Sequence, residues 1–273
     1  MPTIAAPDTN KYAMAELMVI EMARNMGCCD GKFGGCGAAA TLPMAAIRLA
    51  SLTVAPNLSW FCGDSSAINP TFDRLPETAA HPRNMVGAEA RNEMMDVLEL
   101  GLRAEWGFGF QGGMQMDAFG NANMIGIGPY DKLKVRGPGS VGTSWAISIE
   151  HIFMFFWHHS RQVFVDKVDY VSGPGFLSGG DSRWEVAKPQ AKGPAFVFTP
   201  ICVMDFEEGS HRARLKSVHP GYGVDDVVAN TGFEMVVPAD VPTTTAPTNE
   251  ELKLLRTQVD RDRVLKSFRL TFG

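Results

Sequence analysis

Residues 57–66 read NLSWFCGDSS. The first half is rich in apolar and aromatic residues that suit a strand, and the chain then passes directly into small and polar residues. Such a passage predicts a strand whose carboxyl end meets a ligand. Cys62, Gly63 and Asp64 stand at this predicted strand tip, so they are the first candidates for a functional site.

On both sides of this stretch, strand-like and helix-like segments alternate, which favours a layered α/β fold. We expect a single domain over residues 1–273, in which residues 238–273 form a linker and a C-terminal helix. Asp8 or Thr9 is the expected cap of the first helix. This helix is expected to contain the apolar stripe from Ala13 to Met26. The other expected helices span residues 42–52, 90–105, 224–231 and 250–262. The expected strands span residues 32–37, 57–63, 107–116, 122–128, 163–171, 196–206, 212–218 and 233–237.

The bulk composition excludes several classes of protein. The chain has 273 residues, of which 45% are hydrophobic, enough for a large core. The formal net charge of −5 argues against a nucleic-acid surface, and no apolar run reaches the roughly 20 residues of a membrane span. The N-terminus lacks a secretory signal pattern, and the five cysteines lack the spacing of a disulfide framework. We therefore expect a cytoplasmic protein that binds neither nucleic acid nor membrane.

A second candidate segment is GMQMDAFGNAN, residues 113–123. Asp117, Gly120 and Asn121 suit a tight turn, because aspartate and asparagine bond their own backbone and glycine tolerates a positive φ. The composition alone favours a plain hairpin.

A third candidate segment is RGPGSVGTS, residues 136–144. Several glycines in so short a loop let backbone N–H groups approach an anion or an oxyanion. The loop is not a Walker A sequence, since no Gly-Lys-Ser/Thr follows, and its glycine spacing differs from a dinucleotide fingerprint. The pattern alone fits a flexible connector equally well.

The histidines and cysteines do not predict a metal site. The adjacent side chains of His158 and His159 face different directions, which suits core or interface packing better than chelation. Cys28, Cys29 and Cys36 lack the Cys-x-x-Cys spacing of a zinc site.

Several segments, taken in order, resemble the family I CoA transferases. Within residues 113–123, Gln115 to Asn123 carry the family signature Q-x-D-x-x-G-N-x-N. Within that family the resemblance is greatest to the beta subunits of actinobacterial cholesterol ring-cleaving hydrolases, and it runs from about Gly34 to Arg256. The other matching segments are RQVFVDKVDYVSG at 161–173, VMDF at 203–206, ARLKSVHPG at 213–221 and TNEELKLLR at 248–256.

The resemblance implies an open, largely parallel sheet flanked by helices, as in the CoA transferases. It implies a coenzyme A thioester as the substrate, with no permanently bound cofactor and no metal. It places Gln115 at the acyl-CoA pocket, together with Asn121, which also shapes the turn. The backbone contacts to CoA are expected from Gly137, Gly139, Ser140 and Gly142.

The chain departs from the family at the strand tip. Family members place a nucleophilic glutamate there, which is acylated by the thioester, whereas this chain has Gly63. Cys62 and Asp64 flank that position and face the other side of a regular strand, so either needs a local bulge to reach the substrate. The ring-cleaving relatives also have glycine followed by an acidic residue, and there the catalytic carboxylate belongs to the alpha subunit.

We therefore expect the beta subunit of a two-subunit enzyme, paired with an alpha subunit as a heterodimer or an α2β2 heterotetramer. The expected reaction is the hydrolytic opening of a carbon ring in a cyclic β-keto acyl-CoA, in steroid or terpenoid catabolism. One alternative is a true CoA transferase that uses Asp64 or another carboxylate as the nucleophile, and another is a decarboxylase that uses Cys62. A further alternative is a non-catalytic subunit that only binds acyl-CoA or stabilises its partner.

Overall fold

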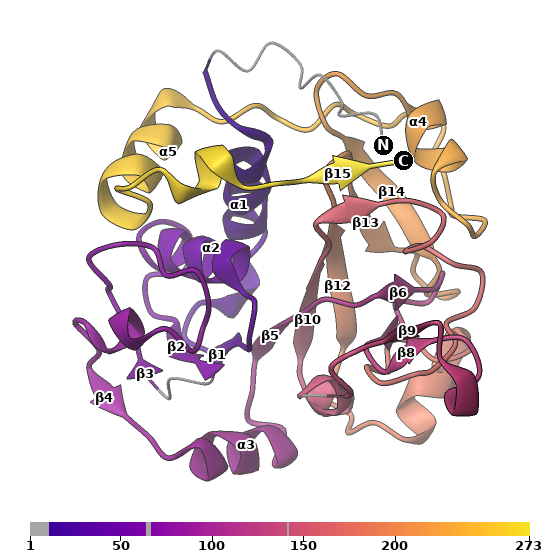
Figure 1. Cartoon of the computed structure of the whole chain (residues 1–273), viewed down its shortest axis with the longest axis horizontal. Coiled ribbons are helices and arrows are strands. Elements are labelled where there is room, and N and C mark those ends of the chain that lie inside the picture. The colour runs from indigo at the N-terminus through magenta and orange to yellow at the C-terminus, as the bar shows by residue number, and fades with distance from the viewer. Residues whose placement is uncertain (1–10, 64–66, 141) are drawn as a thin grey trace. The chain divides into compact units, whose positions relative to one another are not determined.

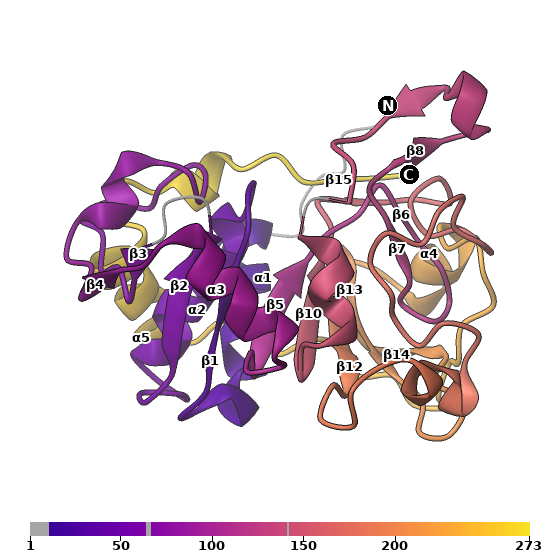
Figure 2. The ribbon, with the colours of Figure 1, turned by 90° about the horizontal axis from the view of Figure 1, so that it is seen from below.

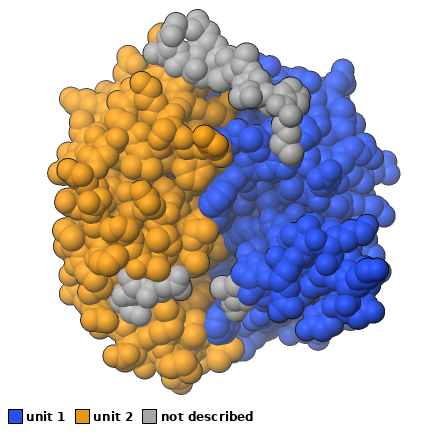
Figure 3. Space-filling model, in the orientation of Figure 1, with its two compact units in different colours: residues 1–7, 111–245, 270–273 blue, residues 8–110, 246–269 orange. Residues whose placement is uncertain are grey.

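The computed structural model describes residues 11–63, 67–140 and 142–273. The chain divides into two compact units, which Figure 3 colours separately. Unit 1 comprises residues 1–7, 111–245 and 270–273, and unit 2 comprises residues 8–110 and 246–269. The single domain expected over the whole chain stays a prediction.

The sheet of unit 2 is parallel on one side and antiparallel on the other. Its strand order is β5-β1-β2-β3-β4, with β1 at Phe33–Cys36, β2 at Ser59–Cys62, β3 at Ala67–Ile68, β4 at Ala90–Arg91 and β5 beginning at Phe108 and ending at Gln111. β1 pairs in parallel with β2 and β5, whereas β3 and β4 run antiparallel beyond β2. The carboxyl ends of β1 and β2 therefore meet at one edge of the sheet.

Two helices of unit 2, α1 (Met14–Arg24) and α2 (Thr41–Ser51), pack against each other (Figure 1). Met18, Met22 and Met26 are each 0% exposed, so the methionines spaced four residues apart belong to the core. The other helical elements of unit 2 in the described residues are the 3₁₀ turns Gly27–Cys29, Pro82–Met85 and Val264–Ser267, α3 (Met94–Leu102), α5 (Asn249–Leu254) and the π-helical turn Leu255–Val259.

The first helix begins later than expected. Asp8 and Thr9, its expected caps, lie outside the described residues, and α1 starts after Ala13. The Glu16 carboxylate accepts the Ala13 backbone N–H at 2.8 Å, which closes the first turn without a capping side chain from the preceding residues.

The sheet of unit 1 has the order β14-β13-β12-β10, with β10 at His151–Phe155, β12 at Gly193–Phe198, β13 at Cys202–Phe206 and β14 at Ala213–Val218. β10 and β12 are parallel, and the two later pairs are antiparallel. α4 (Val224–Ala229) follows β14. Since each unit contains parallel strand pairs together with helices, the predicted α/β class is confirmed.

Short ribbons complete unit 1. β6 (Gln115–Met116) pairs with β7 (Ala122–Asn123), and β8 (Gly126–Ile127) pairs with β9 (Val135–Arg136). Figure 2 shows β8 in a projecting arm of this unit. Another ribbon joins β11 (His158–His159) to β15 (Thr271–Phe272), and the 3₁₀ turns are Tyr130–Lys132, Thr143–Ile147 and Gly180–Glu185.

Some expected strands are absent from the described structure. In the expected strand 163–171, only Phe164 makes a bridge, with Met116, because β6 is too short to pair with more of this segment. The expected strand 196–206 is two strands, since Thr199 and Pro200 turn the chain between β12 and β13. Among the residues that the structure describes, no helix has both the length and the apolar character to cross a membrane.

Candidate active site

The strand tip of unit 2 is closed around Gly63. The parallel register aligns Cys36 of β1 with Cys62 of β2, so the two strand ends lie side by side. A Cβ atom at position 63 would lie 2.8 Å from the carbonyl oxygen of Cys36 and 3.0 Å from the Cα of Gly37. Both neighbours are backbone atoms, which cannot rotate away as a side chain can. Glycine at this position therefore lets the strand ends approach, and a glutamate would require the backbone to shift.

The thiol of Cys62 lies in the core of unit 2. Cys62 is 0% exposed, and its Sγ lies 3.3 Å from the Sδ of Met44 and 3.7 Å from the carbonyl oxygen of Ala79. A reactive cysteine needs access to its substrate, so a catalytic role for this thiol would need Ala79 and its neighbours to move. Its catalytic role stays a prediction, and Asp64, the other candidate, lies outside the described residues.

Asn84 holds the segment that covers this thiol, and no local sequence pattern indicates that role. Asn84 is 0% exposed, and its Nδ2 donates to the carbonyl oxygens of Thr78 and Ala79 at 3.1 and 2.8 Å. Thr41 at the start of α2 donates to the carbonyl oxygen of Glu77 at 2.6 Å. The buried Asn84 Oδ1 has no donor among the described residues. A buried acceptor without a donor is costly and marks a position where a water molecule or a ligand N–H group fits.

The segment 113–123 of unit 1 forms the expected hairpin. Asp117 Oδ1 accepts the backbone N–H groups of Phe119 and Asn121 at 3.0 and 3.1 Å, and Gly120 adopts a φ of +69°. Burial raises the pKa of Asp117, although its hydrogen bonds act in the opposite direction. Aspartate and glycine thus build the turn in the way their chemistry predicts.

The amide side chains of Gln115 and Asn121 in this hairpin make hydrogen bonds to other groups of unit 1. Gln115 is 5% exposed, and its Oε1 accepts from Asn123 Nδ2 at 2.7 Å and from the backbone N–H of Asp169 at 3.0 Å. Asn121 Oδ1 accepts from the backbone N–H groups of Gly175 and Leu177, and its Nδ2 donates to Asp117. Both residues tie the hairpin to the segment 169–177, and their roles in substrate binding stay predictions.

The glycine-rich loop of unit 1 packs on the same hairpin. The N–H groups of Gly137 and Gly139 donate to the carbonyl oxygens of Ile125 and Met124 at 2.9 and 3.1 Å. Gly139 has a φ of +96°, and nothing lies within 4 Å of the place where its Cβ would be. The next residue, Ser140, is exposed. The part of the loop that is open to a ligand therefore begins at Gly139.

The end of this loop is fixed by contacts that also reach the segment 169–177. The carbonyl oxygen of Ser140 accepts from the backbone N–H of Thr143 at 2.9 Å, and Gly142 precedes the 3₁₀ turn Thr143–Ile147. The Thr143 hydroxyl lies 3.1 Å from the carbonyl oxygen of Ser172. Hairpin, loop and segment 169–177 thus form one hydrogen-bonded set within unit 1.

A buried arginine that sequence reasoning missed holds this set in place. Arg183 is 0% exposed and donates to the carbonyl oxygens of Ala146, Gly175, Pro174 and Ala191 at 2.6, 2.7, 3.1 and 3.0 Å. Burial lowers its pKa to about 10. The residues 173–193 read as a glycine- and proline-rich flap, and nothing in that pattern distinguishes a buried arginine from an exposed one.

Two histidines of unit 1, His159 and His219, are buried and hydrogen-bonded within the fold. His159 lies between the hydroxyls of Thr199 and Thr231 at 3.0 and 3.1 Å, and His219 lies between Thr244 Oγ1 and the Thr199 carbonyl oxygen at 2.9 and 3.0 Å. Burial lowers the pKa of His159 to about 3 and that of His219 to about 4, so both rings are neutral near pH 7. Within the described part of the chain, no group of three or more His, Cys, Asp and Glu side chains could hold a metal ion.

Comparison with known proteins decides the family. A profile described as "Coenzyme A transferase" matches residues 13–230. The chain belongs to the coenzyme A transferase family. A subunit of the 3-oxoadipate CoA-transferase of Pseudomonas knackmussii is 32% identical over 246 residues, which cover 90% of this chain and 92% of that protein. The resemblance drawn from the sequence motifs is therefore confirmed.

Two further comparisons agree with this assignment. The cholesterol ring-cleaving hydrolase IpdB subunit of Rhodococcus jostii is 33% identical over 82% of this chain and 85% of that protein. The crystal structure of glutaconate coenzyme A-transferase from Acidaminococcus fermentans superposes with a TM-score of 0.83 at 23% identity, covering 94% of this chain and 98% of the other. This last likeness confirms the predicted fold.

Proposed function

We propose that the protein is the beta subunit of a two-subunit CoA-ester enzyme that opens a carbon ring by hydrolysis. The observation that carries the proposal is the strand tip, where Gly63 packs against the Cys36 carbonyl oxygen and leaves no room for a glutamate without a backbone shift. The similarity to a ring-cleaving hydrolase subunit supports the same reaction. The proposed substrate is a cyclic β-keto acyl-CoA from steroid or terpenoid catabolism.

The catalytic base is proposed to come from an alpha subunit. A carboxylate at position 63 is absent and the Cys62 thiol is buried, so the described part of the tip supplies no group that could be acylated. The relatives from Pseudomonas knackmussii and Rhodococcus jostii are themselves subunits. This chain would then form a wall of the substrate pocket, in a heterodimer or an α2β2 heterotetramer.

The proposed hydrolysis consumes one water molecule. The base removes a proton from water, and the oxygen adds to the ring carbonyl that lies β to the thioester. The bond between that carbonyl carbon and the carbon next to the thioester breaks, and its electron pair forms the thioester enolate. The protonated base returns its proton to that carbon. The product is a ring-opened CoA ester with a new carboxylate.

The glycine-rich loop is proposed to border the thioester. Gly139 has open space on its Cβ side, and Ser140 is exposed, so a CoA ester could approach their backbone. Gly137 and Gly142 would set the path of the loop, and Gln115 would hold the hairpin below it.

Co-expression with the partner chain tests the proposal. The assembled enzyme should convert a cyclic β-keto acyl-CoA into an ester that is heavier by one water molecule, with no carboxylate acceptor added. Isotopically labelled water should place its oxygen in the new carboxylate. Activity that depends strictly on a carboxylate acceptor, with CoA transferred to it, would reject the hydrolase.

A CoA transferase is the second candidate, and one observation favours it. The similarity to the 3-oxoadipate CoA-transferase extends over 90% of this chain, more than the similarity to the hydrolase subunit. Asp64 would then be the acylated carboxylate. Hydroxylamine or borohydride added with acyl-CoA should modify this chain at Asp64 if it is a transferase, and an unmodified chain would exclude that role.

A further inference from the structure

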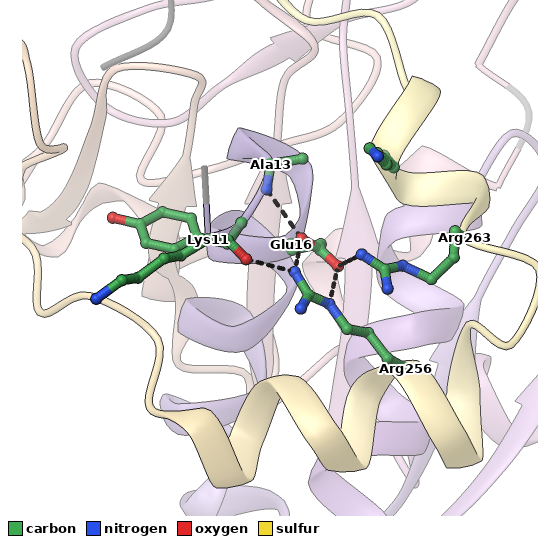
Figure 4. Close-up of a pocket in the computed structure, with 7 residues that line it drawn as sticks. Lys11, Ala13, Glu16, Arg256 and Arg263 are labelled. Atoms are coloured by element: carbon green, nitrogen blue, oxygen red, sulfur yellow. Dashed lines mark hydrogen bonds and ion pairs between the residues drawn. The ribbon is translucent and has the colours of Figure 1, made fainter. Parts of the chain in front are cut away.

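The two ends of unit 2 enclose a positively charged pocket. Its volume is about 390 Å³, within the range of small-molecule sites. The residues before α1 supply Lys11 and Tyr12, and the C-terminal segment supplies Arg256, Arg263 and Lys266 (Figure 4). The pocket is thus formed by the N-terminal and C-terminal segments of unit 2.

The only carboxylate that lines the described pocket is Glu16, and it is already neutralised. Glu16 is 1% exposed, and Arg256 donates to its two oxygens from Nε and Nη2, each at 2.8 Å. Arg263 Nη2 lies 3.5 Å from the same carboxylate. Figure 4 shows both guanidinium groups directed at Glu16. Four cationic side chains against one carboxylate leave a formal net charge of +3.

Asp260, which does not line the pocket, interacts electrostatically with Arg263, so the two lysines carry the charge that no described carboxylate offsets. Lys11 and Lys266 are exposed and make no ion pair with a carboxylate of the described residues, and Figure 4 shows the Lys11 side chain extending away from Glu16. The buried Nε of Arg263 has no acceptor among those residues. An unpaired buried N–H group is costly, so a ligand acceptor would stabilise Arg263 if its side chain turned to expose this donor.

The turn that carries Arg263 is held firmly. Arg263 has a φ of +60°, a conformation that is costly for a residue with a side chain. The Asp260 carboxylate fixes it by accepting the backbone N–H groups of Val264 and Leu265 at 2.8 and 2.9 Å. A strained residue held in this way keeps its guanidinium in place before any ligand binds.

We propose that this pocket binds a phosphate monoester dianion. Guanidinium forks and ammonium groups together are the side chains that recognise phosphate, and a dianion matches the excess of positive charge. The pocket is larger than a bare phosphate needs, and the Tyr12 ring provides a wall for an organic group. The monoester is either a small phosphorylated metabolite or the 3′-phosphate of CoA, which share this chemistry.

Binding is expected to tie the two ends of the unit together. Lys11 precedes α1, whereas Arg263 and Lys266 follow α5, so one dianion contacts both ends at once. The ligand should therefore raise the temperature of unfolding as its concentration rises above the dissociation constant.

Titration calorimetry on the full chain tests the proposal, with ribose 5-phosphate, inorganic phosphate, CoA and 3′-dephospho-CoA as probes at matched ionic strength. We expect saturable binding of at least one phosphate dianion, weakened about tenfold in the double variant Lys11→Gln, Lys266→Gln. The control Lys253→Gln, an exposed lysine on α5 outside the pocket, should bind as the wild type. Arg263→Gln should also weaken binding.

The probes separate the two sources of the monoester. Binding of CoA but not 3′-dephospho-CoA, lost in the double variant, assigns the 3′-phosphate of CoA, whereas preference for ribose 5-phosphate assigns a separate metabolite. No saturable binding of any probe beyond that of chloride, or an equal loss in Lys253→Gln, would overturn the proposal. Because the readout is binding, failure here leaves the ring-opening reaction untouched, and failure of that reaction leaves this site untouched.

Discussion

At the scale of single residues, Gly63 connects the packing of unit 2 to its chemistry. The same backbone contact that excludes a glutamate should also exclude smaller side chains. We predict that Gly63→Ala lowers the free energy of unfolding by about 2 kcal/mol, because the new methyl group would meet the Cys36 carbonyl oxygen. Urea unfolding of the purified chain measures this change.

Gly37 provides the matched control. It lies at the same strand tip, but nothing lies within 4 Å of its Cβ position. Gly37→Ala should therefore change the free energy of unfolding by no more than about 0.5 kcal/mol. Equal effects of the two substitutions would show that strand-end packing does not exclude a side chain at position 63.

The buried histidines predict a pH dependence of stability. As the pH falls below about 6.5, a histidine takes up a proton in the unfolded chain, whereas in the folded chain His159 does so only near about 3 and His219 near about 4. The stability they contribute is thus complete above the unfolded pKa and is lost as the pH falls. Each should lower the free energy of unfolding by about 1.4 kcal/mol per pH unit between about pH 6 and pH 5.

Unfolding of wild type and His219→Gln at several pH values measures this slope. The substitution removes one titrating group, so the slope between about pH 6 and pH 5 should fall by about half of the histidine contribution. A slope unchanged by the substitution would mean that the His219 ring titrates normally in the folded chain.

At the scale of elements, Arg183 is the residue on which the loops of unit 1 depend. It donates to carbonyl oxygens from separate segments, including Ala146 after the glycine-rich loop and Gly175. Arg183→Met should leave these acceptors buried without a donor and lower the free energy of unfolding by about 3 kcal/mol. Arg183→Lys keeps the charge but loses the planar fork, so it should recover only part of this loss.

Arg161→Met is the control for that substitution. Arg161 is exposed, and its Nη1 makes a long hydrogen bond of 3.5 Å to the carbonyl oxygen of Ala229. Its replacement should cost no more than about 0.5 kcal/mol. If the two methionine variants are equally stable in thermal and urea unfolding, Arg183 does not hold the loops.

The elements also explain how far the sequence predicts this fold. Runs of apolar residues predict α1, α2 and the tip of β2 well, because each is buried at most of its residues. It fails for residues 163–171, where Phe164 and Val168 are buried but the backbone finds only one bridge partner, Met116. Burial explains why these side chains are apolar. A strand also needs a neighbouring strand that is long enough to pair with its backbone.

The sequence likewise predicts only those parts of the candidate site that depend on local chemistry. Glycine, aspartate and asparagine in residues 113–123 predict the hairpin because turn chemistry is local. Asn84 and Arg183 leave no local signal, since their roles depend on carbonyl oxygens brought near by the fold. The same holds for the charged pocket, whose cations come from both ends of unit 2.

At the scale of the whole molecule, ion pairs join the distant ends of unit 2. Arg256 bonds Glu16, and Arg24 bonds Glu251 at 2.7 Å. Burial alone would raise the pKa of Glu16, but the Arg256 hydrogen bonds, the Ala13 N–H and the two arginine charges outweigh it and lower the pKa. Its contribution to stability is therefore present above the ordinary value of about 4.3 and is lost as the pH falls through the lower folded value.

A double-mutant cycle of Glu16→Gln and Arg256→Gln measures this link. We expect a coupling of about 2 kcal/mol at neutral pH that disappears in acid. The exposed pair Arg103 and Glu105 is the control and should couple by no more than about 0.5 kcal/mol. Equal coupling of the two pairs would show that burial of Glu16 adds nothing to the link between the ends.

The mass of this chain after reaction tests the central claim most directly. The assembled two-subunit enzyme is mixed with acyl-CoA, trapped with borohydride and separated into its subunits for intact-mass measurement. We predict that this subunit keeps its unmodified mass while the ring-opened product accumulates. A changed mass of the peptide that contains residues 57–66, from reduction of an acylated carboxyl group to an alcohol with release of CoA, would contradict the account, because it would identify an acylated side chain at the strand tip.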